Sequence, residues 1–337
     1  MDLAKKLLYL LFFGGILFLF IWAVYVPKED VSKRISSILE EQVERQDVYF
    51  EGVTLQEVYG GQKFWEIKAR SSSINKDSNI ATLEAATGTF FEKNKPVLNF
   101  IAPRALWNMD KKEIYLLNPI GYDVAMEKDI KNLLARQKEK HFLELPENYK
   151  GKGRGYFFRA KNLYWSLANK KIVCPDGIWL FKGNMIGYGR QFEADVTMEK
   201  VVLSGDPRIT IIDTSLTTVE AQSFIADNPR NTIFATDGVV LISEGIRIYA
   251  DNVVFDQKKK EINLSNNVEV TYLGIKATAK KASYDVAKAR ITLFDSALLE
   301  RNNSALKGDK VIISVKEKEF KVSGKTSVTI PEKELEK

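Results

Sequence analysis

Short alternating segments recur along this chain at near-constant spacing, and they constrain the fold more than any other feature. Residues 250–270 read ADNVVFDQKKKEINLSNNVEV, and a segment of the same order starts 29 residues later, at Ala279. Counted from the opening alanine, an aromatic residue stands at offset 5, a polar turn follows, and apolar residues stand at offsets 12, 14 and 18. Self-similarity at a period of about 20 to 50 residues indicates one supersecondary unit copied many times.

Four copies keep the whole pattern, and looser copies keep part of it. The full copies carry Phe255, Ile262, Leu264 and Val268 after Ala250; Tyr284, Ile291, Leu293 and Ala297 after Ala279; Trp165, Ile172, Cys174 and Ile178 after Ala160; and Trp107, Ile114, Leu116 and Ile120 after Ala102. The looser copies start at Ala69, Ala221 and Gly308. The copies extend over most of the chain, so the fold is expected to be repetitive.

The local period identifies the repeated unit. Apolar and polar residues alternate within each copy, as at Ile262 and Leu264, and a period of two is that of a β-strand with one buried face. The polar segments DQKKKE, DVAKAR, SLANKK and NMDKKE separate the strands, and their Asp, Asn and Ser side chains can hydrogen-bond the backbone to close a turn. The unit is therefore predicted to be an antiparallel β-hairpin, with its lysines interpreted as solvated turn residues.

The composition is that of a large folded β region. The chain has 337 residues, 45% hydrophobic and 11% aromatic, enough for one very large β domain or two ordinary ones. The formal net charge of +6 is modest and spread over the turns. It does not form the basic stripe of a nucleic-acid-binding protein, so no nucleic acid is expected as a partner.

The N-terminus departs from the β pattern. Residues 7–26 carry no charge, and these 20 residues at about 1.5 Å each in a helix would span roughly 30 Å, one hydrocarbon core. We predict a cytoplasmic tip and transmembrane anchor in residues 1–27, oriented by Lys5 and Lys6. A cleaved signal peptide is the alternative, but its apolar part is usually about 7 to 15 residues long. The expected localisation is the inner membrane, single-pass, with the N-terminus cytoplasmic and the β domain periplasmic.

Two further segments interrupt the hairpins. Residues 28–46 place apolar side chains on one helical face and predict a juxtamembrane amphipathic helix. Residues 127–155 begin with a helical pattern, end rich in Gly and Lys, and occupy the place of one hairpin, because the flanking copies start 58 residues apart. The predicted β regions are therefore 47–126 and 156–337, and the segment between them is either a domain boundary or an elaborated loop.

Few residues belong to the types that form catalytic or metal sites. The single histidine, His141, has no histidine partner for a metal site and no serine neighbourhood that suggests a triad. The single cysteine, Cys174, takes an apolar position of a hairpin and is interpreted as a small core residue. We expect no enzyme activity, no catalytic residue, no metal and no cofactor. A glycosidase that uses carboxylates alone is the alternative.

One segment resembles a known family. Residues 52–74 read GVTLQEVYGGQKFWEIKARSSSI and contain the motif W-x-I-x-A at Trp65, Ile67 and Ala69. With the apolar span before it and the repeated hairpins after it, the chain resembles the periplasmic lipopolysaccharide-export proteins LptC and LptA, the OstA-like family, over nearly all residues past 47. Members of the membrane-anchored LptC type commonly have one β-jellyroll, so this longer chain is expected to hold one extended jellyroll or two in tandem.

The resemblance implies a fold and a function. The fold is all-β, with one or more β-jellyrolls built of repeated antiparallel hairpins and preceded by one N-terminal transmembrane α-helix. The protein would accept lipopolysaccharide from an ATP-driven extractor, the inner-membrane ABC transporter complex of lipopolysaccharide export, and pass it toward the outer membrane. An LptA-like periplasmic bridge protein would join it by edge-strand pairing, which is β-augmentation.

An apolar slot would suit this cargo, because an acyl chain of about 14 carbons costs on the order of 10 kcal/mol to expose to water. Two facing sheets of one repeated hairpin would offer the same surroundings at each step. The predicted lipid-binding lining consists of Trp65, Ile67, Trp107, Ile114, Leu116, Trp165, Ile172, Ile178, Phe255, Ile262, Leu264, Tyr284, Ile291 and Leu293. Alternating apolar residues also fill the core of an ordinary β-sandwich, which is the alternative for each of them.

Two other functions stay open. An anchored β-solenoid scaffold of the cell envelope would also stack repeated strands, although long hairpins with varied lysine-rich turns are not typical of solenoid coils. A carrier of another envelope lipid would need the same slot, because an apolar slot recognises acyl chains and not head groups.

Overall fold

The computed structural model of the protein describes residues 48–75, 77–128, 130, 155–213, 216–301 and 304–329. All of them lie within one compact unit, Gln46–Lys337. They form antiparallel strands, which confirms the predicted all-β class. The two predicted N-terminal helices and most of the 127–155 segment lie outside the described residues. Within the ranges given above, no helix has the length and apolar character needed to cross a membrane.

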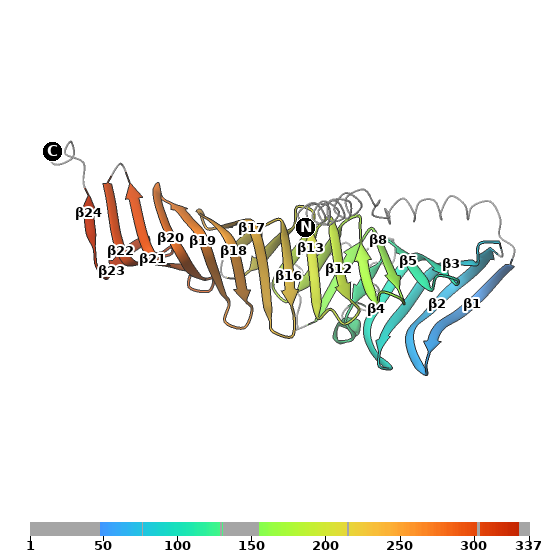
Figure 1. Ribbon diagram of the computed structural model, residues 1–337. Coiled ribbons are helices and arrows are strands. Elements are labelled where there is room, and N and C mark those ends of the chain that lie inside the picture. The colour runs from blue at the N-terminus through green and yellow to red at the C-terminus, as the bar shows by residue number, and fades with distance from the viewer. Residues whose placement is uncertain are drawn as a thin grey trace, which may run out of the picture. The chain divides into compact units, whose positions relative to one another are not determined.

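The strands follow one another in chain order (Figure 1). Four long strands come first: β1 (Val48–Tyr59), β2 (Gln62–Asn75), β3 (Ile80–Glu92) and β4 (Lys95–Asn108). Short strands and a 3-10 helix follow: β5 (Glu113–Leu117), β6 (Ile120–Tyr122), η1 (Val124–Met126), β7 (Tyr156–Ala160), β8 (Asn162–Ser166), β9 (Lys171–Cys174), β10 (Ile178–Lys182), β11 (Met185–Gly189), β12 (Gln191–Asp195), β13 (Lys200–Ser204), β14 (Arg208–Ile212), β15 (Leu216–Glu220) and β16 (Ser223–Asp227). The last strands are β17 (Thr232–Ser243), β18 (Ile246–Asp256), β19 (Glu261–Tyr272), β20 (Ile275–Asp285), β21 (Arg290–Arg301), β22 (Ser304–Ser314), β23 (Glu319–Ser323) and β24 (Ser327–Thr329).

The short strands are divided between two layers. Layer 1 is formed by β5, β8, β9, β12, β13 and β16, each hydrogen-bonded to the next. Layer 2 is formed in the same way by β6, β7, β10, β11, β14 and β15. The long strands belong to both layers, because the two halves of β4 pair with β5 and β6, and the two halves of β17 pair with β16 and β15. Strand pairing thus continues past the 127–155 segment, and the division into two jellyrolls there stays a prediction.

The late long strands turn from one layer to the other at β-bulges. The ladder shifts register at Asp237–Gly238 in β17, Asn266–Asn267 in β19 and Asp295–Ser296 in β21, and all of these residues have positive φ. Asn, Asp and Gly enter the left-handed region more readily than most residues, and a bulge bends its strand. The bulge falls between offsets 14 and 18 of the repeat. Residues at these two offsets therefore lie in different layers.

The turns at the two ends of the hairpins differ. Layer 1 turns carry the polar segments predicted from the sequence, and the Asp256 carboxylate accepts the backbone N–H groups of Lys258 and Lys259 in one of them. Several layer 2 turns are two-residue loops, such as Glu244–Gly245, where both residues have positive φ. Two-residue hairpin loops of this kind match the right-handed twist of the strands.

Candidate functional site

The repeat places its apolar residues in continuous rows. In the copy that starts at Ala250, Phe255 at offset 5 is the direct cross-strand partner of Ile262 at offset 12, and equivalent residues pair in the other copies. The row in layer 1 runs through Val48, Ile74, Ala81, Trp107, Ile114, Trp165, Ile172, Ala194, Val201, Ala226, Ile233, Phe255, Ile262, Tyr284, Ile291, Ile313 and Phe320. Equivalent residues of successive copies therefore lie side by side on neighbouring strands, from β1 to β23.

A second row runs along layer 2. It passes through Leu55, Ile67, Gly88, Phe100, Gly121, Phe158, Leu180, Gly187, Ile209, Val219, Leu241, Ile248, Val270, Ala277, Leu299, Leu306 and Val328. Rings from opposite layers meet, with centroids 5.3 Å apart for Trp65 and Trp107 and 5.4 Å apart for Phe90 and Trp165. The space between the layers, called the interior below, is thus lined by apolar side chains from both.

The interior contains all fourteen residues of the predicted lining. Thirteen are buried members of one apolar cluster, and Trp107 is partly buried against it. Trp65, Ile67 and Ile178 come from layer 2 and the others from layer 1. The fold brings these residues together, and their contact with lipid stays a prediction.

Apart from Trp65, Ile67 and Ile178, the predicted lining lacks the interior residues of layer 2. The repeat pattern described above ends at offset 18, just past the β-bulge where the strand enters layer 2. The alternation continues to offset 20, and residues at that offset in five copies lie in the layer 2 row: Leu180, Leu241, Val270, Leu299 and, exposed at the end of the ladder, Val328. One more step of the period-two pattern would have found them.

Glycines in the layer 2 row have two different effects. A Cβ atom on Gly121 would lie 2.2 Å from Cζ of Phe158, so the absence of a side chain makes room for this buried ring. A Cβ atom on Gly187 would meet nothing nearer than Cδ2 of Leu203, at 3.5 Å. No ring fills the space beside Gly187.

A cavity occupies that space. Its volume is about 60 Å³, and its lining consists of Tyr156, Leu180, Lys182, Met185, Gly187, Met198, Val201, Leu203, Ile209, Phe224, Ala226, Asn228, Ile233 and Gln257. A smaller apolar cavity of about 20 Å³ shares Ile209, Phe224 and Ile233 with it and extends to Phe255 and Ile262. Both are lined by strands of both layers.

The interior opens to solvent between the layer 1 turn after β18 and the layer 2 segments after β10 and β14. This opening, the basic mouth, has a volume of about 590 Å³ and is lined by Lys182, Gly183, Asn184, Met185, Ile211, Asp213, Asn231, Phe255, Gln257, Lys258, Lys260 and Val286. Lys182, Met185 and Gln257 also line the 60 Å³ cavity. The polar opening and the apolar cavity are therefore adjacent.

Two polar contacts connect the layers at the basic mouth. Lys260 Nζ lies 2.8 Å from Oδ2 of Asp213, and Lys182 Nζ donates a hydrogen bond of 2.6 Å to Oδ1 of Asn228. Burial lowers the pKa of the Lys182 ammonium, because the charged form loses hydration. Lys260 is exposed, as a solvated turn residue would be, and its amine also reaches across to layer 2.

Three indole groups add polarity to the interior. Trp65, Trp107 and Trp165 each have a buried Nε1–H without an acceptor in the described part of the chain. A buried donor without an acceptor costs about 1 to 3 kcal/mol. Water or a carbonyl group of a ligand could serve as the acceptor.

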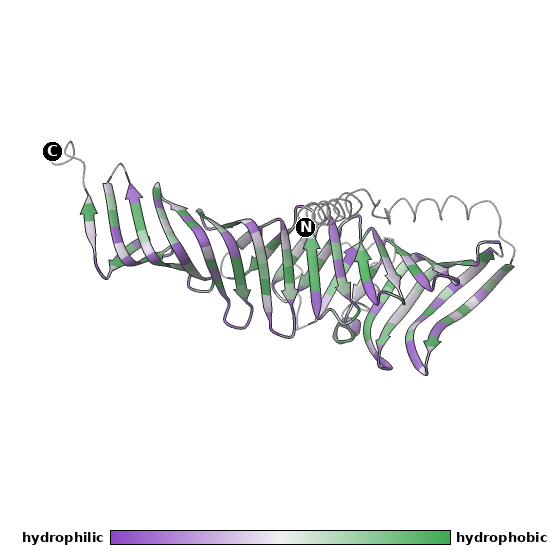
Figure 2. Cartoon of the chain, viewed as in Figure 1, coloured by the Kyte–Doolittle hydropathy of each residue, from purple (hydrophilic) through white to green (hydrophobic). Residues whose placement is uncertain are grey.

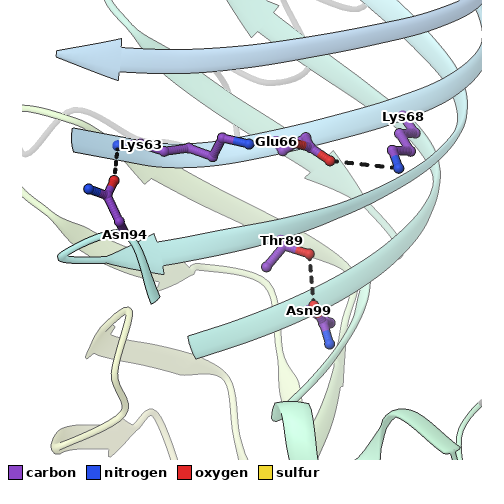
Figure 3. A network of polar contacts seen from close by, with 6 residues as sticks. All are labelled: Lys63, Glu66, Lys68, Thr89, Asn94 and Asn99. Atoms are coloured by element: carbon purple, nitrogen blue, oxygen red, sulfur yellow. Dashed lines mark hydrogen bonds and ion pairs between the residues drawn. The ribbon is translucent and has the colours of Figure 1, made fainter. Parts of the chain in front are cut away.

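The outward face of layer 2 is polar where the inward face is apolar. Glu66 lies between Trp65 and Ile67 in the sequence and points outward. Lys63 donates a hydrogen bond of 2.6 Å to Oε2 of Glu66. On the same face, the Thr89 hydroxyl donates to Oδ1 of Asn99 (Figure 3). The hydrogen bond from Lys63 is the largest cause of a pKa below the usual value at Glu66. Figure 2 shows the alternation of apolar and polar residues along the strands. The apolar character is thus directed to the interior.

Cys174 lies in the same interior, as expected for a core residue. It is fully buried, and burial raises the pKa of its thiol. Within the described ranges, no three His, Cys, Asp or Glu side chains gather as metal ligands would.

Part of the chain matches a known family. Residues 218–319 match the family described as LptA/(LptD N-terminal domain) LPS transport protein. The range covers less than half of the chain and runs from β15 into β23, so it includes the copies of the repeat that start at Ala221, Ala250 and Ala279. No curated protein sequence matches.

A solved structure is also similar. It is described as the crystal structure of LptH, the LptA homologous periplasmic component of the conserved lipopolysaccharide transport device from Pseudomonas aeruginosa. Its sequence is 15% identical to this chain, and the TM-score is 0.32. The similarity covers 34% of this chain and 94% of the LptH chain.

Proposed function

We propose that the chain is an inner-membrane-anchored periplasmic component of lipopolysaccharide transport, and that the interior carries the acyl chains of its cargo. The match of residues 218–319 to the LptA/(LptD N-terminal domain) LPS transport protein family supports this cargo. The observation that carries the proposal is the pair of rows that begin at β1 and end at β23 and β24.

A transport path needs successive positions of similar free energy. Neighbouring strands lie about 4.8 Å apart, and successive strands of the two rows offer apolar side chains or glycines to the interior. Exposure of an acyl chain of about 14 carbons to water would cost on the order of 10 kcal/mol at any step. A chain that moves along the rows avoids this cost, so the energy of ATP is needed for extraction and not for each step.

The interior has to widen to admit a chain. A volume of 60 Å³ corresponds to roughly two water molecules in the liquid, which is too small for an acyl chain. Met185 and Met198 line this cavity, and unbranched methionine side chains repack more easily than branched ones. We place the first widening at the 60 Å³ cavity for this reason.

The partners follow from the same proposal. The extractor is the inner-membrane ABC transporter complex, and an LptA-like bridge protein adds its strands to a free edge of the ladder. Among the described strands, β1 pairs with β2 alone, and it exposes Tyr49, Phe50 and Tyr59. Such an edge suits strand addition, in which main-chain hydrogen bonds supply affinity. The role is one of binding and passage, without catalysis.

Photocrosslinking in cells tests the function. Phe255 is 9% exposed and lines both the basic mouth and the 20 Å³ cavity, whereas Tyr249 on the same strand is 39% exposed. p-Benzoylphenylalanine at Phe255 should capture lipopolysaccharide while the extractor hydrolyses ATP, and the same group at Tyr249 should not. Capture of protein alone at Phe255 would refute the conduit, and capture of phospholipid would assign a different cargo.

A further inference from the structure

The basic mouth combines positive charge with access to the apolar interior. Its lining holds Lys182, Lys258 and Lys260 against a single carboxylate, that of Asp213. Phe255 and Met185 line the same opening and continue into the two cavities. A ligand that fits this surface has an anionic end and an apolar end.

The three lysines are not equally compensated. Lys260 pairs with Asp213 at 2.8 Å, and Lys182 donates to the neutral amide of Asn228 at 2.6 Å. For Lys258, no carboxylate of the described residues lies within ion-pair distance. The neighbouring Lys259 differs, because its Nζ pairs within its own turn with Asp256, at 3.7 Å, and it does not line the mouth. The mouth therefore keeps an excess of positive charge directed at the opening.

We propose that the basic mouth binds the anionic head group of an amphiphile whose chains enter the interior, and that Asp213 competes with this head group for Lys260. The inference rests on the proposed function, since it assumes that acyl chains occupy the interior. A phosphate monoester fits the lysines as a ligand, because its oxygens accept charge-assisted hydrogen bonds. When no head group is present, the Lys260 amine is paired with Asp213 instead.

The competition predicts opposite effects for the two partners of one ion pair. Lys260→Gln removes a cation from the mouth and weakens binding of an anionic amphiphile. Asp213→Asn releases Lys260 and removes the only carboxylate of the lining, so binding becomes tighter. If the pair only held the two layers together, both substitutions would act in the same direction.

Capture titrations with two matched probes test the proposal. The full chain, with p-benzoylphenylalanine at Phe255, is kept in isolated membranes and exposed to alkyne-tagged myristyl phosphate or alkyne-tagged myristyl alcohol. Half-saturation of capture should occur at lower concentration for the phosphate. Lys258→Gln and Lys260→Gln should each raise that concentration about fivefold for the phosphate, the upper range for an exposed ion pair, and leave the alcohol unchanged. Asp213→Asn should lower it for the phosphate.

The control is Lys259→Gln, which removes the same charge one residue away and should change neither probe. Equal capture of both probes by all variants would overturn the head-group site and leave the interior as an acyl-chain site. Weaker phosphate capture by Asp213→Asn would overturn the competition. Capture of neither probe by the chain that carries p-benzoylphenylalanine at Phe255 and no other substitution would overturn the proposed function together with this inference.

Discussion

Gly187→Val should weaken acyl-chain binding without unfolding the protein. Gly187 belongs to the layer 2 row on β11 and borders the 60 Å³ cavity. Its φ is not positive, and an added Cβ would lie in ordinary contact with Leu203 Cδ2, at 3.5 Å. Valine is favoured in strands, so its methyl groups would enter the cavity at little conformational cost.

The magnitude follows from the carbons that valine places in the cavity. Three added carbons take the position of about three methylene groups of a bound chain, and each buried methylene contributes about 0.8 kcal/mol. The loss of roughly 2.4 kcal/mol corresponds to about a fiftyfold weaker affinity, since each factor of ten in affinity equals about 1.4 kcal/mol. The substitution should not lower stability, because it fills an apolar void.

The assay is the capture titration at Phe255 with myristyl alcohol, combined with thermal unfolding. Thr210→Val is the matched control: it adds a methyl group in place of a hydroxyl on β14, next to Ile209 and Ile211 but on the opposite face of the strand. It should bind the probe like the unmodified chain. A folded Gly187→Val protein that also binds with unchanged affinity would refute the assignment of the cavity as an acyl-chain position.

Two further predictions concern stability. Gly121→Ala should destabilise the fold by about 1 to 3 kcal/mol through overpacking, because its Cβ would lie 2.2 Å from the Phe158 ring. Gly187→Ala in the same row should not destabilise it. Urea unfolding of both variants compares them, and equal midpoints would contradict the packing argument. Partial burial raises the pKa of Asp195, but hydrogen bonds from Thr197 and from the N–H groups of Lys200 and Glu199 together outweigh it and hold the pKa below its usual value. This carboxylate therefore contributes stability above its unfolded-state pKa that is lost as pH falls through its lower folded pKa, so Asp195→Ala should flatten the acid limb of a stability–pH curve. An unchanged acid limb would refute that contribution.

The repeat made the hairpins predictable from sequence alone. A period of two sorts side chains to opposite faces of a strand, so Ile262 and Leu264 had to share one face of their strand whatever the rest of the fold. Asp256 and the lysines after it marked the turn, because a short polar side chain can satisfy backbone N–H groups locally. These are short-range properties, and they were read correctly, as was the buried position of Cys174.

The cavity and the basic mouth were not predictable in this way. Gly187 and Gly121 look alike in the sequence, yet one borders a void and the other makes room for Phe158, because the difference depends on side chains that come from other strands. Lys260 and Asp213 are 47 residues apart, and no local pattern relates them.

The sequence by itself determined the strands, their inward faces and the turns, since backbone geometry and side-chain alternation act over a few residues. The tertiary structure decided which faces meet. Two residues in the left-handed conformation, such as Asn266 and Asn267, bend a strand from layer 1 into layer 2, and this bend sets one row opposite the other. The interior, its cavity and its charged opening exist only through that pairing of distant segments, because their shape depends on how side chains from both layers fill the space between them.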